Sequence, residues 1–170
     1  MRDRTMSSNR ITVVLRSPIE DVPPALNQVN ILAENGFQIT VLSPRRPNST
    51  AIAPDLHPTV CQQTLSRDTG VHAALPWRFV RALQFRRKAG YAIRRTRPDI
   101  VIAHDAEGAW ALGKAGAQCG ARVMWHFHHN PYQFSRYSGD GLANRYVLKH
   151  ARQTDLITNC DAMRASIFAR

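Results

Sequence analysis

Short runs of β-branched and apolar residues alternate with helix-like segments along this chain, and this alternation limits its possible folds more than any other feature. Residues 11–15 (ITVVL) and 37–42 (FQITVL) have the composition of buried strands. Between them, Pro23-Pro24 opens a helical stripe that Gly36 ends, because proline suits the first turn of a helix and glycine its C-terminal cap. A strand, a helix and a strand within about 33 residues form a βαβ unit.

The same alternation continues to the end of the sequence. Further strands are predicted at residues 59–65, 99–103, 122–127 and 155–158, and further helices at 75–96, 107–118, 142–152 and from residue 161 onward. Strands that alternate with helices form a parallel sheet with helices on both faces. We therefore predict an α/β, Rossmann-like fold in which residues 10–170 form one domain. Residues 1–9 are polar and charged, and we expect them to form a disordered tail.

The charge of the chain limits its possible partners. Lys and Arg number 23 against 12 Asp and Glu, and the resulting formal charge of +11 attracts nucleic acid, anionic lipid or phosphate-bearing substrates. No RNP, KH or helix-turn-helix pattern accompanies this charge, so nucleic acid is disfavoured. Three widely spaced cysteines, the lack of a signal-peptide pattern and the lack of a membrane-spanning apolar run favour a cytoplasmic protein. Peripheral attachment to the inner face of a membrane is compatible with all of these features.

Polar residues follow several of the predicted strands. Ligands of open α/β sheets bind outside the carboxyl ends of the strands, so Arg16 and Ser17 after the first strand and His104 and Asp105 after the fourth are candidates. A histidine beside a carboxylate can act as a base or hydrogen-bond a sugar hydroxyl. Alternatively, Asp105 serves only to cap the next helix. The first strand is not followed by G-x-G-x-x-G, so NAD, FAD and P-loop nucleotides are disfavoured and we predict no cofactor.

The densest polar cluster follows the fifth predicted strand and contains His126, His128, His129 and Asn130. Alternate side chains of a strand share a face, so His126 and His128 are expected to point the same way. Such imidazoles can bind a metal, a sugar or a phosphate. Alternatively, one of them is a partly buried histidine with its hydrogen bonds satisfied, and His129 is solvated. No H-E-x-x-H motif and no carboxylate at ligand spacing accompanies them, so we predict no metal site.

The predicted helix at residues 75–96 is strongly basic. One face carries Arg78, Arg81, Phe85, Lys88 and Arg95, and Phe79, Val80, Leu83 and Tyr91 lie roughly opposite. We expect the second set to pack on the sheet. The first set is basic and contains an aromatic residue, which is typical of a helix at an anionic membrane surface. The alternative is an ordinary solvated basic face.

Several local patterns, in order, resemble the N-terminal domain of GT-B glycosyltransferases of the group-1 (family 4) type. Residues 32–42 look like that family's "LaeaGyeVtvl", and residues 97–105 look like its "kPDvvhaHd". Residues 120–129 look like "GaPviydaHe", which places His128 on the family's histidine, and residues 144–163 look like "ADlvitvSeam". The resemblance covers nearly the whole chain after the tail. Two family features are missing, because no glycine-rich loop follows the first strand and "DpRv" appears without its arginine.

This family joins an acceptor-binding N-terminal domain to a C-terminal domain that holds the nucleotide-sugar. The implied catalytic residues are His128, His104 and Asp105, and the implied acceptor-binding residues are Arg16, Ser17, His126 and Asn130. The resemblance also implies a hexosyltransferase of polysaccharide biosynthesis with a saccharide or lipid-linked acceptor. The sequence contains no second Rossmann domain and no E-x-x-x-x-x-x-x-E donor motif.

We therefore expect the chain to be inactive by itself, either as a fragment or as a subunit completed by a donor-domain partner chain. Two alternatives stay open at this point. One is a non-catalytic subunit that anchors a split glycosyltransferase to the membrane. The other is a fragment of a GT-B-fold sugar epimerase.

Overall fold

The computed structural model describes residues 9–45, 55–67, 75–104, 115–116, 118–127 and 154–159. The elements of this part are β1 (Arg10–Val14), the short 3-10 helix η1 (Ile19–Asp21), α1 (Pro23–Glu34), β2 (Gln38–Arg45), β3 (Cys61–Arg67), α2 (Leu75–Thr96), β4 (Ile100–His104), β5 (Arg122–Phe127) and β6 (Leu156–Asn159). Residues 115, 116 and 118 are also helical, inside the helix predicted at 107–118, and residue 119 is helical just beyond its predicted end. Residues 1–8 of the predicted tail and the predicted helices at 142–152 and beyond 161 lie outside the described residues.

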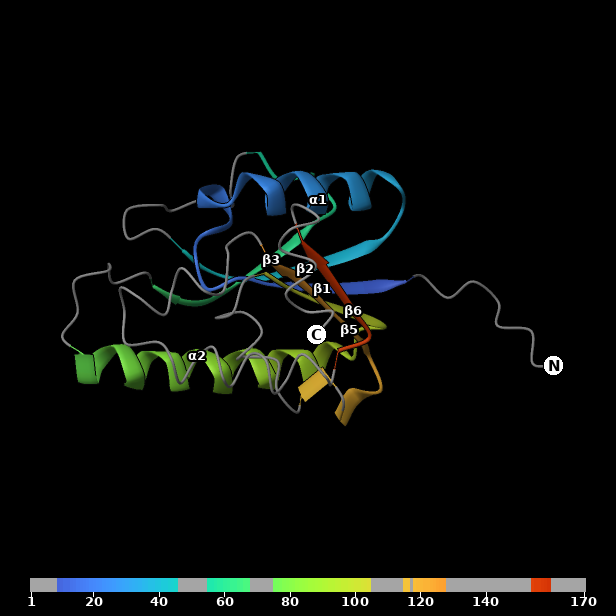
Figure 1. Ribbon diagram of the computed structural model, residues 1–170. Coiled ribbons are helices and arrows are strands. Elements are labelled where there is room, and N and C mark those ends of the chain that lie inside the picture. The colour runs from blue at the N-terminus through green and yellow to red at the C-terminus, as the bar shows by residue number, and fades with distance from the viewer. Residues whose placement is uncertain are drawn as a thin grey trace.

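The six strands of the described part form one parallel sheet in the order β3-β2-β1-β4-β5-β6. The strand order reverses between β1 and β4, which makes that position the topological switch point. Figure 1 shows α1 on one face of this sheet and α2 on the other. The predicted α/β, Rossmann-like fold with helices on both faces is therefore confirmed.

Two hydrophobic cores, one on each face, hold the helices to the sheet. Val13 and Val14 are adjacent in β1 and point to opposite faces of the sheet. Both are fully buried because a helix covers each face. Val13 packs in the core that contains Val29 of α1, and Val14 packs in the core that contains Ile93 of α2. A strand buried on both faces has no alternation of apolar and polar residues, which is why residues 11–15 are all buried and the one polar residue among them, Thr12, is β-branched.

Gly36 ends α1 as predicted. Its φ is 84°, a left-handed conformation that glycine adopts without steric cost. The Gly36 N–H donates to the carbonyl of Ala33 at 3.0 Å, and the Phe37 N–H donates to the carbonyl of Leu32 at 3.1 Å. This pair of bonds is the Schellman motif, and it turns the chain directly into β2.

The second strand runs further than the sequence predicts. Ser43-Pro44 is expected to stop the strand after residue 42, but β2 continues to Arg45. Pairing with β1 ends at Leu42, whose carbonyl accepts the N–H of Leu15 at 3.0 Å. The register with β3 shifts between Ser43 and Arg45. Pro44, which has no N–H, therefore lies at an irregular position where a ladder hydrogen bond is not needed.

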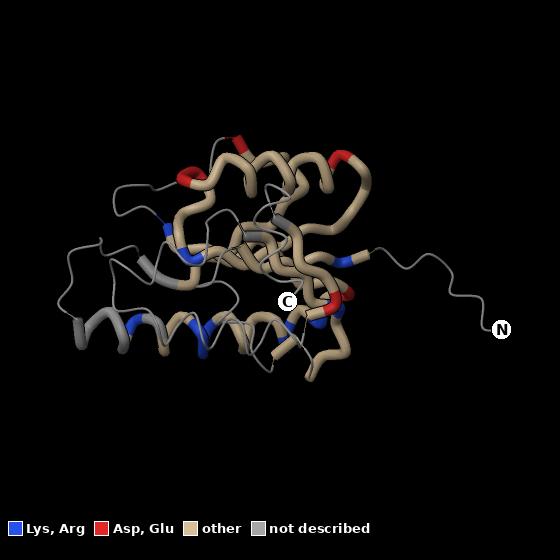
Figure 2. Tube along the Cα trace, viewed as in Figure 1, with Lys and Arg blue, Asp and Glu red and all other residues tan. Residues whose placement is uncertain are grey.

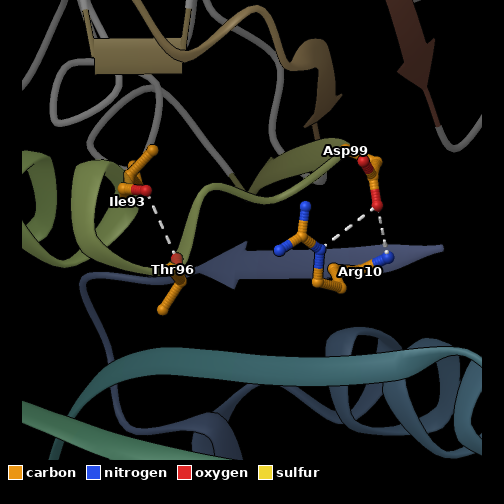
Figure 3. A network of polar contacts seen from close by, with 4 residues as sticks. All are labelled: Arg10, Ile93, Thr96 and Asp99. Atoms are coloured by element: carbon orange, nitrogen blue, oxygen red, sulfur yellow. Dashed lines mark hydrogen bonds and ion pairs between the residues drawn. The ribbon is translucent and has the colours of Figure 1, made fainter. Parts of the chain in front are cut away.

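Two aspartates that precede strands tie the amino edge of the sheet together. Asp99 Oδ2 accepts the backbone N–H of Arg10 at 2.9 Å and lies 3.5 Å from Arg10 Nε, as Figure 3 shows. Asp155 Oδ2 accepts the backbone N–H of Val123 at 2.7 Å. In both cases the aspartate N–H also donates to the carbonyl of the same partner. These pairs join β4 to β1 and β6 to β5. They help to fix the register of the strands, and this register sets which side chains lie next to one another at the carboxyl edge.

The end of α2 is closed by Thr96, whose hydroxyl donates to the carbonyl of Ala92 at 3.0 Å and lies 3.3 Å from that of Ile93 (Figure 3). The Ile93 carbonyl also accepts the backbone N–H of Arg97 at 2.9 Å, so side-chain and backbone bonds together close the last turn of the helix. In the described residues, no helix combines the length and the hydropathy needed to cross a membrane.

The predicted orientation of α2 is wrong. Phe85, expected at the membrane-facing surface, is 4% exposed and packs in the core with Ala89 and Ile93. Tyr91, expected to pack on the sheet, is 63% exposed, and Leu83 is 48% exposed. The buried stripe contains small alanines, which let the helix approach the sheet closely. Lys88 and Arg95, expected on the same surface as Phe85, are exposed as predicted.

Candidate functional site

Three polar side chains form a row across the carboxyl edge of the sheet. His104 of β4 is in register with His126 of β5, and His126 is in register with Thr158 of β6. Side chains in register on neighbouring parallel strands point to the same face. His104 lies two residues after Ile102, which belongs to the core beneath α1, so the row is on the α1 side. We call His104, His126 and Thr158 the edge row.

Hydrogen bonds link the edge row to α1 and to itself. His104 Nε2 lies 3.0 Å from Oε1 of Gln28 on α1. The rings of His104 and His126 pack with their centroids 5.3 Å apart at an interplanar angle of 42°. His126 Nδ1 lies 2.7 Å from Thr158 Oγ1, and the Thr158 hydroxyl lies 3.3 Å from the carbonyl oxygen of Trp125. The contacts therefore run from α1 through β4 and β5 to β6.

Burial separates the members of this row. His104 is 3% exposed, so its contacts with Gln28 and His126 are made inside the protein. His126 and Thr158 are half-buried, and part of each side chain reaches the surface. Imidazole and hydroxyl groups donate and accept hydrogen bonds without a fixed charge, which suits a ligand with many hydroxyls. The row can therefore offer hydrogen bonds to a polar ligand.

The structure places only some of the predicted site residues. Arg16 is half-buried and Ser17 is exposed, and both follow β1 beside the switch point. Asp105, His128 and Asn130 lie outside the described residues, so a shared face for His126 and His128 stays a prediction. Among described residues, His126 packs against His104.

Sequence reasoning missed Gln28 and Thr158 as site residues. Aligning the predicted strands at their starts would not have found Thr158, because that register pairs it with Trp125, one residue away from the observed partner His126. No sequence pattern indicated Gln28 as a site residue, since a glutamine in an amphipathic helix is ordinary. Glu20 and Arg45 lie at the same edge and were not predicted either. Glu20 Oε2 and Arg45 Nε are buried and have no hydrogen-bond partner among the described residues.

A cavity of about 630 Å³ opens at the opposite edge of the sheet. Its lining includes Arg10, Gln38 and Cys61, which are the first residues of β1, β2 and β3. Parallel sheets bind their ligands at the carboxyl ends of the strands, not at the amino ends. We therefore place the candidate site at the edge row and not at this cavity.

The family model for Glycosyltransferase Family 4 matches residues 25–169. The chain belongs to this family. The edge row of this family 4 domain thus lies at the carboxyl edge of an N-terminal GT-B domain of group-1 type. No curated protein sequence matches the chain.

Solved structures share the fold of this family 4 domain at low identity. A putative UDP-N-acetylglucosamine 2-epimerase from Listeria monocytogenes is 11% identical with a TM-score of 0.62, over 96% of this chain and 42% of that one. Acinetobacter baumannii MurG is 16% identical with a TM-score of 0.55, over 90% and 42%. Phytolacca americana UGT2 complexed with UDP-2fluoro-glucose and pterostilbene is 14% identical with a TM-score of 0.52, over 75% and 32%. The family 4 domain therefore spans less than half the length of each of these structures.

Proposed function

We propose that this chain is the acceptor-side half of a family 4 glycosyltransferase, and that its edge row binds the acceptor. The observation that carries the proposal is the row of His104, His126 and Thr158 at the carboxyl edge of the sheet. It presents neutral hydrogen-bonding groups where a parallel sheet binds its ligand. A saccharide acceptor, free or lipid-linked, is a ligand of matching chemistry.

In the proposed reaction, a sugar moves from a nucleotide donor to an acceptor hydroxyl. This chain positions the acceptor through hydrogen bonds and provides no covalent nucleophile. The donor is proposed to be bound mainly by a second domain, in the same polypeptide or in a partner chain. The complex of UGT2 with a UDP-sugar and pterostilbene supports the pairing of a nucleotide donor with an acceptor in proteins that share this fold.

Replacing His126 with alanine is expected to weaken acceptor binding about tenfold or more, because one or two hydrogen bonds to the acceptor are lost. A panel of immobilised saccharides and lipid-linked saccharides first identifies a binder, and calorimetry then gives its affinity for each variant. His57→Ala is the matched control, since His57 precedes β3 at the other edge of the sheet. Equal affinities for both variants would contradict the placement of the acceptor at the edge row.

The face of α2 that points away from the sheet supports a second candidate function, which is attachment to a membrane. The chain would attach either in addition to binding an acceptor or as a non-catalytic anchoring subunit. Val80, Leu83 and Tyr91 are exposed on this face. Figure 2 shows Lys and Arg along α2, and residues 75–96 contain no Asp or Glu. The exposed cations on this side are Arg87, Lys88, Arg94 and Arg95. Apolar side chains among cations suit the interface of an anionic leaflet, and we propose attachment to the inner face of a membrane.

Replacing Arg87 and Arg94 together with glutamine is expected to weaken binding to vesicles of anionic lipid about 30-fold. Each cation near such a surface contributes about 1 kcal/mol, and about 2 kcal/mol corresponds to that factor. Co-sedimentation with vesicles containing phosphatidylserine measures the change. The double variant Arg97→Gln, Arg122→Gln removes the same charge from exposed sites outside α2. An equal loss in both double variants would show that only net charge matters and would contradict a specific role of this face.

A further inference from the structure

We infer that Thr158 is a positioning residue that selects the tautomer of His126, so that Nδ1 carries the proton and Nε2 accepts. The inference deepens the proposed function of the edge row and rests on it only for the identity of the ligand. It concerns a threonine on the last described strand, next to the histidine but not itself expected to react. The two contacts of the Thr158 hydroxyl carry the argument.

A hydroxyl has one proton to donate. Thr158 Oγ1 lies 3.3 Å from the Trp125 carbonyl oxygen, which can only accept, so the hydroxyl donates its proton there. The shorter contact, 2.7 Å from Thr158 Oγ1 to His126 Nδ1, then needs its proton from the ring. Neutral His126 therefore carries its proton on Nδ1. In that tautomer Nε2 has a lone pair and can only accept a hydrogen bond.

The register of the sheet holds Thr158 against both Trp125 and His126. Trp125 and His126 are consecutive in β5, and Thr158 is in register with His126 on β6. The same threonine therefore contacts the carbonyl of one residue and the ring of the next. On the other side of the ring, His104 packs at a centroid distance of 5.3 Å and is itself held by Gln28. Rotation of the His126 ring is thus opposed from both neighbouring strands.

This tautomer determines what the ring recognises. A group that binds Nε2 of neutral His126 must supply a proton, which a hydroxyl does and a phosphate dianion or a carbonyl does not. At this atom the ring then selects hydrogen-bond donors, such as hydroxyl or amide N–H groups. An acceptor hydroxyl is such a group, and hydrogen bonding to Nε2 orients its oxygen lone pairs for attack on the donor sugar.

The test is a long-range ¹H–¹⁵N spectrum of the histidine-labelled chain, recorded well above the pKa range of histidine so that the rings are neutral. His126→Gln assigns the signals of this ring. Wild type is expected to show the Nδ1–H pattern, Thr158→Val to lose it, and Thr158→Ser to keep it because serine restores the hydroxyl. Thr64→Val, on the exposed surface of β3, is expected to leave the pattern unchanged. An Nε2–H pattern in wild type, or no change in Thr158→Val, would overturn the inference.

Acceptor affinity separates the inference from the proposed function. With the saccharide found in the binding panel, Thr158→Val is expected to bind about tenfold more weakly than wild type, and Thr158→Ser to bind nearly as well. If the tautomer changes as expected but no saccharide binds wild type, the proposed function fails and the role of Thr158 stands. If affinity falls equally in the valine and serine variants, the hydroxyl is not the cause and the role of Thr158 fails.

Discussion

Phe85→Ala is expected to lower the free energy of unfolding by about 3–5 kcal/mol, the range typical of a large aromatic side chain removed from a core. Phe85 is 4% exposed and packs between α2 and the sheet together with Leu65 and Trp125. Its removal leaves a cavity that the neighbouring strands cannot fill without moving. Equilibrium unfolding in urea, followed by circular dichroism, measures the loss.

The matched control is Tyr91→Ala on the opposite face of the same helix. Tyr91 is 63% exposed, and surface substitutions of this kind usually change stability by less than about 0.5 kcal/mol. The pair therefore tests which face of α2 packs on the sheet. A larger loss for Tyr91→Ala than for Phe85→Ala would reverse the orientation described here and would restore the one that the sequence suggested.

Trp125→Ala is expected to have a similarly large effect, about 3–5 kcal/mol. Trp125 is 2% exposed and lies in the α2 core with Val101 and Val123. The next residue, His126, points to the other face and is only half-buried. His126→Ala removes one hydrogen bond at the edge of the sheet, so its expected cost is below about 2 kcal/mol.

Urea unfolding of these two variants tests the alternation of β5 directly. Trp125→Ala is expected to lower the urea concentration at the unfolding midpoint far more than His126→Ala does. The dependence of the unfolding free energy on urea concentration is expected to be similar in both variants. Equal shifts would mean that both side chains are core residues, which would remove His126 from the candidate site.

The fold could be predicted from sequence because its signals are local. Runs of β-branched and apolar residues, the proline pair in the first turn of α1 and the glycine at φ 84° each reflect a nearby backbone requirement. The orientation of α2 could not be predicted with the same reliability. Its two faces both carry large apolar residues, and which one packs is decided by the fit of Ala89 and Ala92 against the sheet.

The candidate site was predictable only in part. His104 and His126 each follow from the rule that ligands bind at the carboxyl ends of parallel strands. Their contact with each other, and with Thr158, depends on strand order and register across segments far apart in the chain. Gln28 adds a contact over 76 residues of sequence separation. Such contacts are set by tertiary packing, for which a single sequence carries no local signal.

The central claim is that this chain holds the acceptor and that the nucleotide-sugar is bound elsewhere. Calorimetric titration of the purified chain with UDP-glucose, UDP-N-acetylglucosamine and a GDP-sugar tests this claim most directly. The expected result is no detectable binding at micromolar concentration, while a saccharide from the binding panel still binds the same preparation. Micromolar binding of a nucleotide-sugar that is abolished by His128→Ala would contradict the claim, because it would mean that this domain itself holds the donor.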